Sequence, residues 1–290
     1  MVLQEIEKEW IVVEKGQDGY PTEWLSLTDA PEKLYALGNL ALLKERKLTV
    51  VGSRRTPANI LKLAEKTAKE LSKKFVILTG TADGGDTSAI QGGLSNPQGK
   101  GVICLLAGGM LALPQSQIPL LKKVMEKGLL LSVQEPNVPA REYSYEYRNK
   151  LLAHLGLGTF VLGAGEKSGA LITAKYTEKQ RKPIFAFPYP PSSAYGVGCN
   201  RLIKQGGKLV ECAEDIAEYF SVDLTVETPT VSLTQDEEKL YSALKQAQEM
   251  HAVELSERTG IPVYKIRAIT ASLEVKGLVV ALGGNCYTAV

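Results

Sequence analysis

Short apolar runs alternate with longer amphipathic stretches through the middle of the chain, between residues 48 and 220. The apolar runs are typical of buried strands, and the stretches between them have the three-to-four-residue spacing of helices. Residues 59–74 show the helical spacing most clearly, with one face made by Ile60, Leu63, Ala64, Thr67, Ala68 and Leu71. Regular alternation of this kind predicts an α/β domain with a doubly wound, mostly parallel sheet, an extended Rossmann-like fold.

The predicted elements follow one another at short intervals. Strands are expected at 48–51, 75–78, 102–106, 129–131, 159–162, 184–187 and 208–210. Helices are expected at 59–74, 86–94, 116–127, 145–155 and 169–181. The predicted domain covers residues 48–222. Residues 1–47 precede it as a lead-in segment that is too short to fold alone, and we expect its apolar side chains to pack against the domain.

After residue 222 the pattern changes. Residues 223–233 contain Thr, Ser and Pro with little periodicity, and they predict a linker. Thr234 and Glu237 then have the spacing of a capping box at a helix start, and three helical stretches with a small hairpin predict a winged helix over 234–290. Seven acidic and six basic residues lie between Asp236 and Lys276. This balance suits contact with a protein as well as it suits reading DNA.

Composition narrows the class of protein. The 290 residues are 44% hydrophobic, and no apolar stretch is long enough to cross a bilayer. Glu and Lys occur near the N-terminus where a secretion signal would be apolar, so a cytoplasmic location without membrane contact is expected. The four cysteines lack CxxC spacing and only two histidines are present. We therefore expect reduced thiols, no metal and no cofactor.

Four predicted strands run into loops of small or phosphate-binding residues. A glycine lets the backbone approach a ligand closely, hydroxyl and guanidinium groups bind phosphate oxygens, and helix N-termini favour negative charge. The candidate residues in these loops are Gly52, Ser53, Arg54, Gly80, Gly108, Gly109, Ser168 and Gly169. Because the carboxyl ends of parallel strands meet at one edge of a sheet, the loops together predict an anion-binding crevice.

Basic residues gather beside the same loops, among them Arg148, Lys150 and Lys175. The net charge of +2 does not by itself indicate a nucleic-acid-binding protein, and a single basic cluster is usually a solvated face. Convergence of several clusters on one edge favours a groove for a polyanion. Three tyrosines near Arg148 are suited either to base stacking or to ordinary packing: Tyr143, Tyr145 and Tyr147.

Six sequence blocks stand in a characteristic order along the chain. They are Gly19-Tyr20-Pro21, Val51-Gly52-Ser53-Arg54, Thr79-Gly80-Thr81-Ala82, Arg148-Asn149-Lys150, Ser168 to Ala174 and Gly198 to Ile203. The blocks resemble those of the DprA/Smf family of DNA-processing proteins, over nearly the whole chain. The resemblance implies a non-catalytic protein that binds single-stranded DNA, forms a homodimer and helps to load a RecA-type recombinase in natural transformation.

The resemblance and the loop chemistry together predict which residues line the DNA strand. They are Gly52, Ser53, Arg54, Gly80, Gly108, Gly109, Arg148, Asn149, Lys150, Ser168, Gly169 and Lys175. Three positions depart from the family pattern, because Asp83 replaces the usual arginine, Ile90 the usual histidine and Gly163 a carboxylate. Asp83 brings negative charge into a loop expected to face phosphate, which predicts weaker DNA binding or a rearranged groove.

Two other functions remain open from the residues. The first is a nucleotide-binding sensor or an enzyme similar to nucleotide phosphoribohydrolases, since related Rossmann-like families include such enzymes. Their Pro-Gly-Gly-x-Gly-Thr-x-x-Glu pattern is absent here, and Glu166 is the carboxylate that lies near the matching loop. The second is a scaffold that acts only through its winged helix.

Overall fold

The computed structural model describes residues 10–224, 233–247, 249–276 and 278–289. The chain divides into two compact units, Met1–Leu224 and Thr225–Val290. The predicted linker, 223–233, lies largely outside the described residues. In the part of the chain that is described, no helix combines the length and the apolar character that crossing a bilayer requires.

The first unit is built on one nine-stranded sheet in the order β1-β2-β6-β5-β4-β3-β7-β8-β9. Strands β3 to β9 pair in parallel, whereas β1 and β2 run antiparallel at one edge. The strand bounds are β1 Ile11–Glu14, β2 Lys33–Gly38, β3 Lys47–Val51, β4 Val76–Thr79, β5 Val102–Leu105, β6 Leu129–Ser132, β7 Thr159–Val161, β8 Ile184–Ala186 and β9 Lys208–Leu209. The predicted mostly parallel α/β sheet is confirmed.

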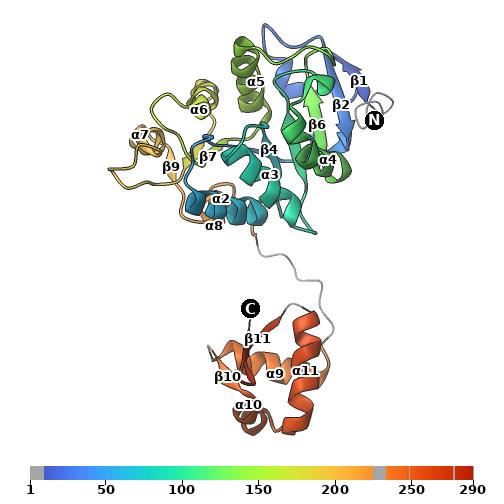
Figure 1. The fold of residues 1–290 in the computed structure, drawn as a ribbon, viewed down its shortest axis with the longest axis vertical. Helices are drawn as coiled ribbons and strands as arrows, with labels where there is room; N and C mark the ends of the chain where they lie inside the picture. The colour runs from blue at the N-terminus through green and yellow to red at the C-terminus, as the bar shows by residue number, and fades with distance from the viewer. Residues whose placement is uncertain (1–9, 225–232, 248, 277, 290) are drawn as a thin grey trace. The chain divides into compact units, whose positions relative to one another are not determined.

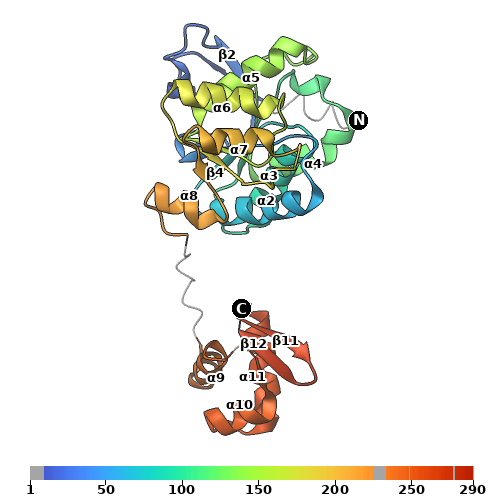
Figure 2. The same ribbon diagram turned by 90° about the vertical axis from the view of Figure 1, so that its left-hand side faces the viewer.

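Helices cover both faces of this sheet. Their bounds are α2 Ala58–Leu71, α3 Gly85–Ser95, α4 Ile118–Lys127, α5 Glu142–Leu155, α6 Gly169–Lys179, α7 Val197–Lys204 and α8 Ala213–Tyr219. Figures 1 and 2 show α2, α3 and α4 together on one side and α5 and α6 on the other, and α2 packs on α3 as α5 packs on α6. The unit therefore has three layers, with the sheet in the middle.

The direction of winding reverses in the middle of the sheet. From β3 the chain steps outward through β4, β5 and β6, with α2, α3 and α4 as the crossovers. Helix α5 then carries the chain back to β7, which pairs with the other side of β3, and β8 and β9 continue outward from there. Right-handed crossovers place helices on opposite faces for the two directions. The loops after β3 and β7 consequently diverge at one point of the sheet edge.

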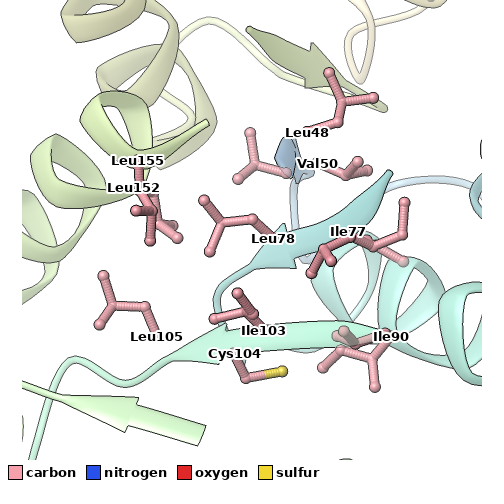
Figure 3. Packing of buried hydrophobic residues seen from close by; sticks show 14 of the residues in the cluster. Leu48, Val50, Ile77, Leu78, Ile90, Ile103, Cys104, Leu105, Leu152 and Leu155 are labelled. Carbon is pink, nitrogen blue, oxygen red and sulfur yellow. The ribbon is translucent and has the colours of Figure 1, made fainter. Parts of the chain in front are cut away.

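The central strands have apolar residues on both faces because helices cover both. Leu48, Val50, Ile77 and Leu78 are fully buried, and Figure 3 shows them with side chains from the neighbouring strand and from α5. Ile90 of α3, one of the three departures from the family pattern, belongs to this core and has no exposed surface. A histidine at this position would have to hydrogen-bond within the core.

Within the predicted lead-in segment, the described residues 10–47 add two strands to the sheet of the domain that they precede. Strand β2 pairs with β6, and β1 pairs with β2. Trp24 is fully buried, and its indole Nε1 donates a hydrogen bond to the Leu151 carbonyl of α5 at 3.0 Å. The segment is stable only against the larger domain, because two short strands cannot bury enough apolar surface alone.

The second unit has a small core of its own. Three helices, α9 Gln235–Lys245, α10 Ala252–Thr259 and α11 Val263–Val275, pack against a three-stranded antiparallel sheet. Its strands are β10 Met250–His251, β11 Val279–Gly283 and β12 Cys286–Ala289. Thr234 and Glu237 form the predicted capping box at the start of α9. Three helices with a terminal hairpin are the arrangement of a winged helix.

Candidate nucleic-acid interface

A cavity of about 570 Å³ opens beyond the carboxyl ends of β3, β4, β7 and β8. Its walls come from residues 51–55 after β3, Ala82 and Asp86 after β4, Tyr145, Arg148 and Asn149 of α5, residues 165–170 with Thr173, and Ala194 and Tyr195 after β8. This is the place where the winding reverses, and α/β folds bind ligands there. Seven predicted residues line the cavity: Gly52, Ser53, Arg54, Arg148, Asn149, Ser168 and Gly169.

Asp86 joins two of the loops at this cavity. Its buried carboxylate accepts the Gly52 amide through Oδ1 and the Ala82 amide through Oδ2, each at 3.2 Å. The backbones of Gly52 and Gly85 touch, so that a Cβ on either residue would collide with the other. A bridging carboxylate and a close glycine contact therefore hold the β3 and β4 loops in one arrangement.

Arg148 supplies the charge opposite Asp86 and is itself only 6% exposed. Its Nη1 donates to the Leu105 carbonyl at 3.1 Å, and its Nε donates to Oδ1 of Asn149 at 3.0 Å. Burial raises the pKa of Asp86 and lowers the pKa of Arg148, while their mutual attraction opposes both shifts. Arg148 is thus mainly engaged in organising the cavity wall.

Gly80 lies in the buried layer beneath these side chains and does not line the cavity. A Cβ at this position would collide with Nη1 of Arg148 and with Oδ2 of Asp86. The glycine after β4 is therefore required for the charged pair to fit, and its contribution to a ligand is indirect.

The start of α6 forms a further wall. Ser168 is the N-cap, its Oγ accepting the Ala170 amide at 3.4 Å, and the Gly169 carbonyl accepts Nδ2 of Asn149 at 3.3 Å. Thr173, one turn further along, lines the same cavity, and within the described residues its buried Oγ1 has no hydrogen-bond partner. A buried hydroxyl without a partner is costly. A helix N-terminus beside it favours an anionic group as the partner.

The accessible part of the cavity is positively charged. Arg54, Arg55 and Lys167 line it with exposed side chains, and none of the three forms an ion pair with another described residue. The exposed carboxylate in the lining, Glu166, lies 3.6 Å from Nη2 of Arg201. Because that carboxylate is already paired, the three cations dominate the field in the opening and attract anions.

Four predicted residues lie elsewhere. Lys150 points away from the cavity, where its Nζ contacts Oδ1 of Asp29 at 2.6 Å and lowers the pKa of that carboxyl. Gly108 and Gly109 pack against the backbone of residues 135–140, with the Gly109 amide donating to the Val138 carbonyl at 2.8 Å. Lys175 is exposed on α6 outside the cavity lining. Their part in binding a strand stays a prediction.

The two other departures from the family pattern have different surroundings. Gly163 has no room for a side chain, since a Cβ there would lie 2.5 Å from Oγ1 of Thr56 and 2.7 Å from the Tyr189 hydroxyl. That hydroxyl donates to the Leu162 carbonyl at 2.8 Å. Asp83 is exposed, next to Ala82 but outside the cavity lining. Its charge therefore acts on the cavity from the rim.

Sequence reasoning missed several lining residues. Asp86 follows the Thr79-Gly80-Thr81-Ala82 block but was not assigned to the site. Thr173 lies inside the Ser168 to Ala174 block and was not assigned either, and Tyr195 was not singled out. Tyr195 comes from the loop after β8, which the rule of strand carboxyl ends could have included. Apart from its place in that block, Thr173 resembles any threonine within an amphipathic helix. Among the described residues, no group of three or more His, Cys, Asp or Glu is arranged to hold a metal ion.

The winged helix has a mixed surface. Arg267 of α11 donates through Nη2 to Oδ1 of Asn285 in the hairpin at 2.8 Å. Val263 and Tyr264, at the start of the same helix, are exposed. A cation of α11 is therefore engaged within the unit, and apolar side chains occupy part of the surface of this helix.

Comparison with known proteins finds a matching family model for each of the two units. The family model of DNA recombination-mediator protein A matches residues 11–221, and that of the sugar-specific transcriptional regulator TrmB matches 230–290. The chain is 33% identical over 203 residues to the DNA processing protein DprA of Streptococcus pneumoniae, covering 70% of this chain and 72% of the relative. It is 30% identical over 279 residues to Protein Smf of Escherichia coli, covering 92% of this chain and 74% of the relative.

Solved structures of DprA proteins are also similar to this chain. An X-ray structure of DprA from Streptococcus pneumoniae superposes with a TM-score of 0.69 at 30% identity, over 74% of this chain and 76% of that one. A structure of DprA from Helicobacter pylori, described by its single-stranded DNA binding mode, superposes with a TM-score of 0.65 at 25% identity, over 73% and 95%. With the motifs, the sheet and the cavity at its switch point in agreement, the chain belongs to the DNA recombination-mediator protein A family, the DprA/Smf proteins.

Proposed function

We propose that this protein binds single-stranded DNA without sequence preference through the cavity at the β3–β7 switch point. The observation that carries the proposal is the combination of three exposed, unpaired cations with a helix N-terminus and a buried unpartnered hydroxyl around one opening. All of these groups recognise phosphate oxygens, and none reads a base edge. The relative from Helicobacter pylori, which binds single-stranded DNA, supports the same ligand.

In this arrangement, separate elements of the fold would contact one phosphate from different sides. Ser53 and Arg54 would bind from the β3 loop, and Ser168 and Gly169 from the start of α6. The buried pair of Asp86 and Arg148 would keep these two walls in position. Tyr145 lines the cavity with an exposed ring, 6.0 Å from the Arg148 guanidinium, and offers a stacking surface for a base beside the phosphate.

Membership of the family supports a wider role. We propose a cytoplasmic, non-catalytic mediator that binds incoming single strands as a homodimer and helps to load a RecA-type recombinase in natural transformation. Near-balanced charge and exposed apolar residues on α11 favour a protein partner, or another copy of the chain, as the ligand of the winged helix.

Titration of a fluorescent oligonucleotide tests the binding proposal. Full-length protein should bind a single strand far more tightly than a duplex or a mononucleotide, and log affinity should fall linearly with log salt. Arg54→Ala should weaken binding and make that slope shallower by about 0.7, because one phosphate contact is lost. Lys62→Ala is the matched control, since Lys62 is an exposed cation on α2 outside the cavity. Equal slopes for the two variants would exclude Arg54 from the site.

A second candidate function is a nucleotide-binding sensor or phosphoribohydrolase-like enzyme. It is favoured by the cavity volume of about 570 Å³, which is in the range of small-molecule sites. The chemistry is less favourable, because Asp86 is buried and bound to two amides, and Glu166 is the exposed carboxylate of the lining. Release of free base from nucleoside monophosphates, lost in Glu166→Gln, would establish the enzyme.

A further inference from the structure

Tyr195 is an exposed aromatic residue of the first unit. It lies in the loop after β8 and lines the cavity, with 48% of its surface exposed. Among the described residues its hydroxyl makes no hydrogen bond, and its ring contacts no other aromatic ring or cation. Leaving such a ring in water is unfavourable. The loop therefore presents a flat apolar surface at the edge of an anion-binding cavity.

The position of Tyr195 is well determined by its neighbours. The next residue, Gly196, lies directly against the ring of Tyr189, where a Cβ would collide. The Gly196 amide donates to the Ser193 carbonyl at 3.2 Å, and the Gly198 amide donates to the Ala164 carbonyl at 2.8 Å. These contacts attach the loop after β8 to the loop after β7. Tyr195 is consequently pre-positioned, and a tyrosine loses little conformational entropy on stacking.

We infer that Tyr195 is a base-stacking residue that holds one unpaired nucleobase next to the phosphate bound by Ser53, Arg54 and the start of α6. The inference rests on the proposed binding of single-stranded DNA and adds a determinant for selecting single strands. Tyr145 and Tyr195 come from different elements, α5 and the loop after β8, and both line the same opening. Each would offer a ring to a different base of the strand.

The chemistry explains why such a contact selects single strands. A base in a duplex is already stacked on both faces. A tyrosine can reach its π-surface only after the base has been unstacked, which costs free energy. An unpaired base exposes its face, and stacking on an aromatic side chain contributes about 1–3 kcal/mol whatever the base. Stacking at Tyr195 therefore adds affinity for unpaired strands without adding sequence preference.

The inference is tested with three variants of full-length protein and two oligonucleotides, one normal and one abasic. Tyr195→Ala should weaken binding of the normal strand about 5- to 150-fold, with an unchanged salt slope. It should leave the abasic strand unaffected. Tyr195→Phe should bind as the wild type does, because the ring and not the hydroxyl makes the contact. Tyr143→Ala is the control, since Tyr143 is 62% exposed on α5 but does not line the cavity.

A second readout identifies the contact directly. Photocrosslinking of a 5-iodouracil-substituted strand should attach DNA to the peptide containing Tyr195, because this reaction is most efficient with an aromatic ring that is stacked on the base. Equal affinity of Tyr195→Ala and wild type for the normal strand would overturn the inference while leaving DNA binding intact. If Tyr195→Phe binds the normal strand as weakly as Tyr195→Ala does, the hydroxyl and not the ring makes the contact, and the stacking inference is wrong. Wild-type protein that binds no single strand would overturn both proposals.

Discussion

Replacing Arg148 by methionine should test whether the buried charge pair organises the cavity. The change removes donors to the Leu105 carbonyl and to Asn149, and it leaves the buried carboxylate of Asp86 without its opposite charge. Removing one charge of a buried ion pair costs about 3–5 kcal/mol. Because Asp86 and Arg148 attract each other through their charges without a direct ion pair, we expect a loss near the lower end of this range. Lys150→Met is the matched control on the same helix, because its ion pair with the half-exposed Asp29 is worth only about 0–1 kcal/mol.

The loss in Arg148→Met should also depend on pH. Without Arg148, the pKa of Asp86 in the folded state rises further above its unfolded value, since the largest influence that opposes desolvation is lost. The folded state then binds more protons than the unfolded state between the two pKa values, so stability falls as pH increases through that window. The variant should be more strongly destabilised at pH 8 than at pH 5. Adding Asp86→Asn should restore part of the stability and remove the pH dependence.

Urea unfolding followed by tryptophan fluorescence provides the assay. Both tryptophans of the chain, Trp10 and Trp24, belong to the first unit, so their emission reports that unit in full-length protein. The shift in the urea concentration at the midpoint of unfolding, at an unchanged m-value, gives the change in the free energy of unfolding. A loss no greater than that of Lys150→Met, or a larger loss without pH dependence and without recovery in the double variant, would refute a charge pair at this position.

Three further predictions concern other parts of the molecule. Asp83→Arg should tighten binding of a single strand and steepen its salt dependence, because a repulsive charge at the rim becomes attractive; flat affinity in the same titration would mean that this loop does not face DNA. Hydrogen bonds from Lys276, Ser272 and the Thr234 amide lower the pKa of Glu237 to about 2. The winged helix should therefore lose ~2 kcal/mol of its free energy of unfolding as pH falls from about 4.5 towards 2. Circular dichroism of residues 233–290 should show this loss, and the Glu237→Gln variant should not. A chain ending at Leu224 should keep its affinity for a single strand within about tenfold, or 1.4 kcal/mol, and a greater loss would make the winged helix a principal DNA contact.

Much of the fold was determined by the sequence alone. Continuous apolar strands, helical periodicity at residues 59–74 and glycine-rich loops after strands predict a doubly wound sheet with an anion site at one edge. The family motifs confirm the same arrangement. Helices α7 and α8 were missed because each is only eight or seven residues long. Strands β1 and β2 were missed because their pairing with β6 is a contact between distant parts of the chain, which local patterns do not encode.

The tertiary structure alone decided which candidate side chains share a site. Arg148, Asn149 and Lys150 are consecutive, yet helix geometry turns the first two towards the cavity and the third towards Asp29. Gly80 and Gly108 both follow strands, but one accommodates a charged pair and the other packs on residues 135–140. Tyr195 was not noticed because a tyrosine in a proline-rich loop carries no local signal. A sequence specifies the kinds of groups available, whereas the crossing of chain segments far apart decides which of them are buried, paired or left free to bind a ligand.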